Sequence, residues 1–301
     1  MPYRVTLLDW LLLAGLVVCW GSSFVMSKVA LSHVSPEWIA AARLVIGAVI
    51  LLAVTLAKGG LPPRRFLAAY GWLGLVGNAA PFFAITWGMQ FITSGVAGLL
   101  MATIPLIIIV MAHFLLPGEK LTAPRVAGFI LGFIGIIVLM GPDKLLDFRG
   151  HGMELIGQLA VVAGCVMYGV NSITAKRINL PGTVAVAAGV LLAGAILATA
   201  GALATAPFTL HEAPASTLLA LFGLGLFPTG IATVLWFKAV ERTSPTFTAM
   251  SNYLVPIFAL CFGALTLGEH IGWNVLAALL LVLAGIFVSR RKSVPTPQPS
   301  R

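Results

Sequence analysis

Residues 93–119 read TSGVAGLLMATIPLIIIVMAHFLLPGE, and residues 243–269 read TSPTFTAMSNYLVPIFALCFGALTLGE. Both stretches begin with Thr-Ser, carry a proline near the middle and end with Gly-Glu, and they lie 150 residues apart. The same offset relates Gly135-Ile136 to Gly285-Ile286, and an offset of 148 relates Trp20-Gly21 to Tyr168-Gly169. Self-similarity at one spacing is typical of internal duplication, so the sequence predicts two copies of about 150 residues.

The composition places both copies in a membrane. Of the 301 residues, 59% are hydrophobic and 9% are charged, whereas soluble domains have about 25% charged residues. Too little polar surface remains to cover a water-facing globule, which excludes secreted proteins and ordinary cytosolic enzymes. The three cysteines lie inside apolar runs, so no disulfide framework is expected. A spanning helix needs about 20 apolar residues, and the chain has room for about ten, which we predict at residues 10–31, 36–57, 67–90, 94–116, 124–141, 153–175, 183–205, 217–239, 245–267 and 271–289.

The number of helices in each copy sets the topology. Five helices per copy force the second copy to cross the membrane in the opposite direction from the first. Inverted repeats are the architecture of many secondary transporters, whose substrate site lies near the midplane between the repeats. We therefore predict an all-α integral membrane protein with ten transmembrane helices around a central cavity. Its two inverted five-helix repeats are residues 1–147 and 148–292, and a disordered tail follows over 293–301.

The basic residues predict the orientation. The formal net charge is +9, and cytoplasmic loops of membrane proteins carry Lys and Arg in excess. With the N-terminus in the cytoplasm, 14 of the 18 Lys and Arg fall on the cytoplasmic side and three on the other. Both termini are therefore expected in the cytoplasm, and this distribution accounts for the charge without a nucleic-acid partner.

Several motifs together resemble a known family. They are Cys19-Trp20-Gly21-Ser22-Ser23-Phe24, Arg43, the run from Phe91 to Pro105, Gly118-Glu119-Lys120-Leu121-Thr122 and, in the second copy, Trp236, Thr243-Ser244, Pro256 and Leu267-Gly268-Glu269. In this combination the chain resembles the EamA-type drug/metabolite transporter superfamily over nearly its whole length. The resemblance implies a multi-pass protein of the bacterial inner membrane that exports small metabolites through a cavity lined mainly by helices 1, 3, 4, 6, 8 and 9. The chain is similar to amino-acid exporters of the YddG type, whereas other members move nucleosides, sugars or cationic compounds.

Polar side chains at membrane depth are costly, and those present usually face protein or a cavity. Asn78 precedes Pro81, and Asn252 with Tyr253 precedes Pro256. Each proline frees a backbone carbonyl four residues earlier, and a free carbonyl beside an amide can hold an ammonium group. The alternative is that the prolines only kink their helices while the amides bond neighbouring helices.

Aromatic side chains inside the predicted spans complete the expected site. Flat amphipathic rings suit a small zwitterion or a cation, although they also occur in the interfacial belt. Together with serine and amide groups, they can bind both ends of an amino acid without a charged side chain in the cavity. The predicted substrate contacts are Trp20, Ser23, Asn78, Trp87, Tyr168, Asn171, Trp236, Asn252 and Tyr253, and the predicted kink or gate prolines are Pro81, Pro105, Pro228 and Pro256.

Three charged residues and one glycine pair have two interpretations each. Arg43 lies deep enough in its helix to need a partner, and it could attract a substrate carboxylate. In the resembled family it looks structural, and we favour that interpretation. Glu119 and Glu269 follow a helix end, where the dipole of the next helix favours a carboxylate, so we favour structural roles over gating. Gly128 and Gly132 have GxxxG spacing, which we assign to packing within the fold rather than to a dimer contact.

The missing motifs narrow the function. All nine acidic residues fall at or near predicted helix ends, which disfavours proton-coupled efflux through a buried carboxylate. We expect a facilitator that exports down a concentration gradient. No hydrolase, P-loop or metal-ligand spacing occurs, so we expect no enzymatic activity, no metal and no cofactor, with an intramembrane enzyme as the alternative. The expected partners are a small-molecule substrate and the lipid bilayer, for a monomer or weak homodimer.

Overall fold

The computed structural model describes residues 6–117, 119, 121–140, 148–207, 213–243, 245–248 and 250–289. Over these residues the secondary structure is helical, with no β-strand. The predicted repeat boundary beside residues 141–147 and the predicted tail over 293–301 fall at or in segments outside the described residues.

Eight helical runs of the described chain are long and apolar enough to cross a membrane, and two shorter apolar helices, α14 and α15, follow them. Their positions agree with the expected helix ranges to within a few residues. The helices are α1 (Leu7–Ala30), α2 (Pro36–Ala57), η1 (Arg64–Phe66), α3 (Leu67–Gly74), η2 (Leu75–Ala79), α4 (Ala80–Gly88), α5 (Ser94–Met101), α6 (Ile104–Leu115), α7 (Ala123–Met140), α9 (Phe148–Ile178), α10 (Val184–Thr205), α11 (Ala215–Leu224), η4 (Gly225–Ile231), α12 (Ala232–Arg242), α13 (Pro245–Thr248), α14 (Ser251–Leu267) and α15 (Trp273–Ser289).

Local chemistry explains several of these helix ends. The hydroxyl of Thr93 accepts a hydrogen bond from the backbone N–H of Val96 at 3.3 Å, and thereby caps the start of α5. Thr183 caps α10 in the same way. At the end of α14, Gly268 adopts a left-handed conformation with φ +65°, which glycine reaches without a steric penalty. The Thr93-Ser94 motif therefore marks a helix start, and the Gly268-Glu269 motif marks a helix end.

Two of the long runs contain a π-helical stretch. One is η2, between α3 and α4, and the other is η4, between α11 and α12. They begin 150 residues apart in the sequence. Pro81 lies in the first turn of α4, directly after η2, and Pro228 lies inside η4. π-Helical turns inside longer helices occur frequently at functional sites.

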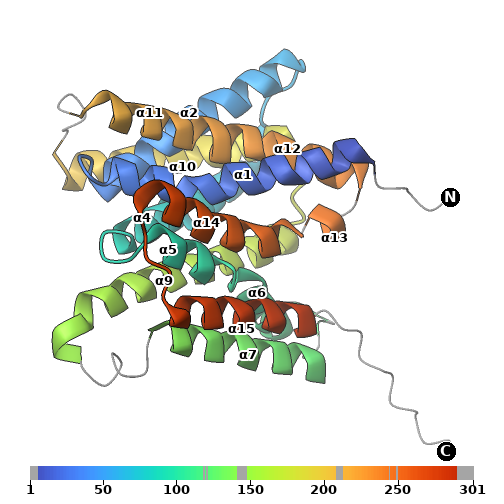
Figure 1. Cartoon of the computed structure of the whole chain (residues 1–301). Helices are drawn as coiled ribbons and strands as arrows, with labels where there is room; N and C mark the ends of the chain where they lie inside the picture. Colours follow the sequence, from blue (N-terminus) through green and yellow to red (C-terminus); the bar gives the residue numbers. More distant parts are fainter. Residues whose placement is uncertain are drawn as a thin grey trace, which may run out of the picture.

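Small residues bring helices from the two halves of the chain into close contact. α7 packs along α15, where a Cβ added to Gly128 would clash with the carbonyl oxygen of Gly285. This contact confirms that Gly128 of the GxxxG pair packs within the fold. A second contact between the two halves is made by larger apolar side chains. On the opposite flank of the bundle, α2 packs along α10 through a buried cluster that includes Leu44, Leu51 and Leu191 (Figure 1).

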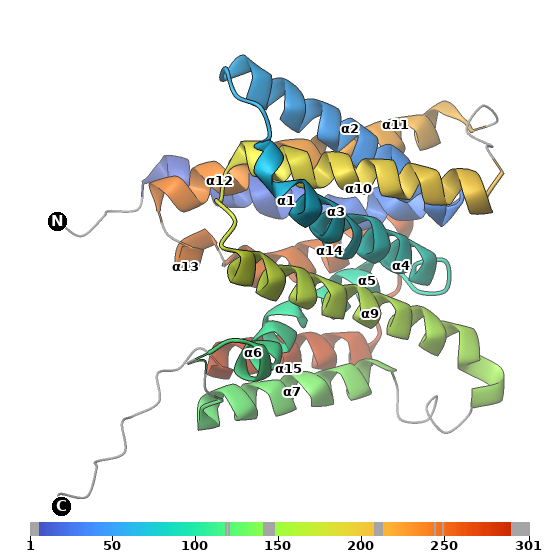
Figure 2. The same cartoon turned by 180° about the vertical axis from the view of Figure 1, so that it is seen from behind.

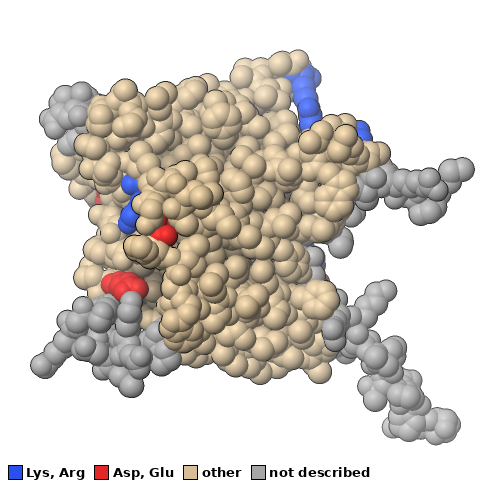
Figure 3. Space-filling view, in the orientation of Figure 1, with Lys and Arg blue, Asp and Glu red and all other residues tan. Residues whose placement is uncertain are grey.

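The described helices form one bundle, with α2 and α10 on one flank and α7 and α15 on the other (Figures 1 and 2). The start of α1 and the end of α15 lie at the same end of the bundle (Figure 1). Figure 3 shows a broad uncharged face, with the described Lys, Arg, Asp and Glu near its left and right margins. Such an apolar band, bordered by charges, is typical of a protein that spans a membrane several times.

Candidate functional site

A cavity of about 390 Å³ lies inside the bundle, between helices from both halves of the chain. Its lining comes from α1, α2, η2, α4, α5 and α6 of the first half and from α9, α10, η4, α12 and α14 of the second. None of the described lining residues belongs to α7 or α15. Cavities of about 300–1,000 Å³ are large enough to enclose a small molecule.

The cavity brings together six of the nine predicted contact residues. They come from four helical segments in the two halves, α1, η2, α9 and α14, and they are Trp20, Ser23, Asn78, Tyr168, Asn171 and Asn252. Of the four prolines, Pro228 and Pro256 also line the cavity. That these residues contact a substrate stays a prediction.

Three predicted contacts lie outside the lining in this conformation. Trp87 packs edge-on against Phe91, with ring centroids 5.1 Å apart. Trp236 is 37% exposed, and Tyr253 packs against the main apolar core. Pro81 and Pro105, each in the first turn of a helix, are likewise not part of the lining. Their proposed roles as contacts or gates stay predictions.

The amide side chains of the cavity are available to a ligand. Asn78, Asn171 and Asn252 make no side-chain hydrogen bond to any part of the chain that the structure describes. Ser23 is different, because its hydroxyl donates to the backbone carbonyl of Trp20 at 2.6 Å. Each amide offers both a donor and an acceptor, so the three can serve either end of a zwitterion.

Arg43, on α2, also faces the cavity, although the sequence interpretation favoured a structural role for it. Its Nε donates to the hydroxyl oxygen of Thr229 in η4 at 2.9 Å. Its Cζ lies 3.9 Å from the centroid of the Phe82 ring, and that ring contacts the ring of Tyr168 edge-on. A guanidinium over an aromatic face is stabilised electrostatically. The sequence signal was the depth of Arg43 in its helix, but the side of the helix that faces inward could not be read from it.

At one end of the bundle, Glu269 closes a contact between the two halves. Its carboxylate accepts hydrogen bonds from the backbone N–H of Ser94 at 2.7 Å, from the Ser94 hydroxyl at 2.9 Å and from the backbone N–H of Gly95 at 3.0 Å. These groups form the N-terminus of α5, where a helix dipole favours negative charge. Close by, Lys28 donates to the carbonyl oxygens of Met89 and Ile92, just before α5.

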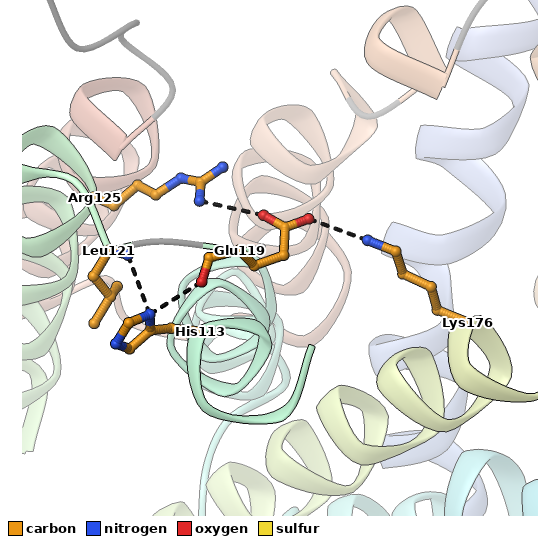
Figure 4. A network of polar contacts seen from close by, with 5 residues as sticks. All are labelled: His113, Glu119, Leu121, Arg125 and Lys176. Atoms are coloured by element: carbon orange, nitrogen blue, oxygen red, sulfur yellow. Dashed lines mark hydrogen bonds and ion pairs between the residues drawn. The ribbon is translucent and has the colours of Figure 1, made fainter. Parts of the chain in front are cut away.

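The other Gly-Glu motif makes a different, more exposed contact (Figure 4). The carboxylate of Glu119 pairs with Lys176 at 3.1 Å and with Arg125 at 3.4 Å, and the ring Nδ1 of His113 lies 3.0 Å from the Glu119 carbonyl oxygen. The hydrogen bond and charge of Lys176 hold the pKa of the Glu119 carboxyl below its ordinary value of 4.5. The Lys176 side chain is 62% exposed. The two related motifs thus occupy unlike environments.

The described residues contain no group of three or more His, Cys, Asp or Glu side chains that could hold a metal ion. Nor do the described residues that line the cavity include an Asp or a Glu. Neutral amides, hydroxyls and rings, together with one guanidinium, therefore make up the polar chemistry of the cavity wall.

Several known proteins are similar to this chain, and their names describe transporters. A transporter YoaV of Bacillus subtilis is 28% identical, over 92% of this chain and 97% of its own. The inner membrane transporter YedA of Escherichia coli is 28% identical, over 95% and 94%. A protein of Streptantibioticus cattleyicolor, named a probable terminal-alkyne amino-acid exporter, is 29% identical over 92% of both chains.

Fold and family comparisons cover nearly the whole chain. A crystal structure with 24% sequence identity superposes with a TM-score of 0.67, over 94% of this chain and 96% of the other, which shows a common fold. The model of the EamA-like transporter family matches residues 8–141 and 155–291. The protein is a multi-pass membrane protein, and the chain belongs to the EamA-like transporter family.

Proposed function

We propose that the protein is a secondary transporter that exports amino acids and similar small metabolites across the bacterial inner membrane by alternating access. In this proposal ten passes form two inverted repeats, residues 1–147 and 148–292, with both termini in the cytoplasm. The observation that carries it is the cavity, which draws unpaired amides and aromatic rings from both halves of the chain. A small zwitterion matches that chemistry, because amides bind both of its charged ends while rings cover its side chain.

Three further observations support the proposal. The family model matches two successive parts of the chain, residues 8–141 and 155–291. The start of α1 and the end of α15 lie at the same end of the bundle, as an even number of passes requires (Figure 1). One relative bears the name of an amino-acid exporter.

The prolines supply a means of movement. Pro228 and Pro256 interrupt helical hydrogen bonding at the cavity wall. Pro81 and Pro105 lie in the first turns of α4 and α6, where one helical segment gives way to the next. In the proposed cycle these positions flex, while the halves rock around the bound substrate.

Efflux from liposomes tests the proposal. The purified full-length protein is reconstituted, the liposomes are loaded with labelled aromatic, aliphatic and charged amino acids, and efflux is followed with and without a pH gradient. We expect faster efflux than from loaded liposomes that lack the protein. The rate should stay the same when the pH gradient is collapsed. Trp20→Ala should reduce the rate, whereas Trp273→Ala, at a residue 75% exposed and outside the cavity, should not.

Two results would contradict separate parts of the proposal. Absence of efflux for every amino acid would remove amino acids as substrates, and nucleosides and cationic compounds would be tested next. Strict dependence on the pH gradient would overturn the facilitator mechanism but leave amino-acid export intact.

A further inference from the structure

Arg43 is held in place by groups that leave its outer edge free. The Nε bonds to Thr229, whose own hydroxyl donates to the carbonyl oxygen of Leu224 at 2.9 Å, and Phe82 lies under the guanidinium plane. Both Nη groups lack a hydrogen-bond partner in the described part of the chain. A guanidinium whose Nη groups are free presents parallel N–H donors that match the two oxygens of a carboxylate.

The surroundings provide no counter-charge. Among the described residues that line the cavity, Arg43 is the single Lys, Arg, Asp or Glu. A buried cation without an anion is costly, and one aromatic face offsets only part of that cost. Lys28, a partly buried cation next to the cavity-lining Ser27, differs because two backbone carbonyls already accept its hydrogen bonds.

The position of Arg43 does not by itself require a charge. At the 148-residue offset that relates the first helices of the two halves, the residue that corresponds to Arg43 is Leu191. Leu191 lies on α10 and also lines the cavity. The same place in the other half therefore accommodates an apolar side chain, so the demands of packing do not account for the arginine.

We propose that Arg43 binds the carboxylate of the transported molecule, so that the cavity accepts small carboxylates, amino acids among them, and rejects cations that lack one. This inference rests on the proposed function, and it names the substrate class of the same cavity. It also assigns to Arg43 a binding role in place of the structural role that the sequence favoured.

Three ligands that share one ring test the proposal on the unmodified protein. They are L-phenylalanine, 3-phenylpropionate, which lacks the amine, and phenethylamine, which lacks the carboxylate. Binding to the full chain in detergent is measured by isothermal titration. We expect both carboxylates to bind at least about 10-fold more tightly than phenethylamine, since a hydrogen bond to a charged group contributes about a tenfold factor or more. Phenethylamine binding as tightly as 3-phenylpropionate would overturn the proposal.

Variants test whether Arg43 is the source of the preference for carboxylates over phenethylamine. Arg43→Gln should weaken binding of 3-phenylpropionate about 10- to 100-fold and leave phenethylamine unweakened, so the selectivity ratio falls toward one. Arg43→Lys keeps the charge but loses the planar fork, and it should give an intermediate ratio. Arg64→Gln removes the same side chain from an exposed position outside the cavity, and should leave the ratio unchanged. An unchanged ratio in Arg43→Gln would overturn the assignment, because a purely structural arginine alters both ligands alike.

Efflux separates the failure of this inference from that of the proposed function. If 3-phenylpropionate binds with the expected selectivity but no amino acid leaves the liposomes, amino-acid export is wrong and the carboxylate site stands. If phenethylamine leaves as fast as phenylalanine, transport stands and the carboxylate inference is wrong. If none of the three ligands binds, the inference is overturned.

Discussion

Replacement of Glu269 by Gln tests whether the contact at the start of α5 holds the two halves together. A glutamine carbonyl can keep the bonds from the Ser94 hydroxyl and the Gly95 N–H, but its NH₂ group then faces the backbone N–H of Ser94. Ser94 is fully buried, so this donor is left unsatisfied. An unsatisfied buried donor costs about 1–3 kcal/mol, and the lost charge at a helix N-terminus adds about 1 kcal/mol. We expect a total destabilisation of about 2–4 kcal/mol.

Thermal unfolding of the purified protein in detergent measures this loss, with the intrinsic fluorescence of its seven tryptophans as the signal. For a chain of this size each kcal/mol lowers Tm by about 2 °C, so Glu269→Gln should lower Tm by about 4–8 °C. Glu241→Gln is the matched control, because Glu241 is an exposed acid at the end of α12. Exposed substitutions change stability by about 0.5 kcal/mol or less, which is about 1 °C.

Equal Tm values for the two variants would refute the reasoning. The Glu269 carboxylate would then contribute no more than an exposed acid does, and its three hydrogen bonds would not stabilise the contact between α14 and α5.

Two further predictions concern the contacts of Glu269 and of Glu119. Gly263→Ala places a methyl group 2.6 Å from both the Ser94 hydroxyl and the Glu269 carboxylate, so we expect it to lower Tm by several degrees. The control is Gly201→Ala in α10, where the added methyl group meets open space. This variant should leave Tm unchanged or raise it slightly. Because Lys176 lowers the pKa of Glu119, the stability that this pair contributes is complete above pH 4.5 and falls as the pH drops through the lowered folded-state pKa. The Tm difference between the wild type and Glu119→Gln should therefore be small and constant from about pH 6 to 8, and should shrink below about pH 4.5; a difference that grows on acidification would contradict this.

The positions of the helices could be predicted because a membrane-spanning helix needs an apolar run of about 20 residues, and such runs can be read from the sequence. Which face of each helix points toward the cavity could not be predicted so easily. In a soluble helix the polar residues mark the outer face, but a helix surrounded by lipid is apolar on both faces, and nothing marks the inner one. Trp20 and Trp236, both tryptophans in apolar helices, were therefore predicted alike as contacts, although Trp20 lines the cavity and Trp236 lies outside it, 37% exposed.

Two of the predicted contacts outside the cavity follow a π-helical stretch, Trp87 after η2 and Trp236 after η4. Trp87 lies nine residues after Asn78, and at about 100° per residue this places Trp87 on the opposite side of the helix from Asn78. The helical period could therefore have excluded Trp87 from the cavity. The partner of Glu269 could not be predicted, because Ser94 lies 175 residues away in the sequence.

The contacts on the two flanks restrict how the cavity can open. The α2–α10 pair on one side and the α7–α15 pair on the other each join the first half of the chain to the second, and the cavity lies between them. In the proposed alternating-access cycle, the two halves therefore tilt about the line between these two contacts, so that the cavity opens toward one side of the membrane as it closes toward the other.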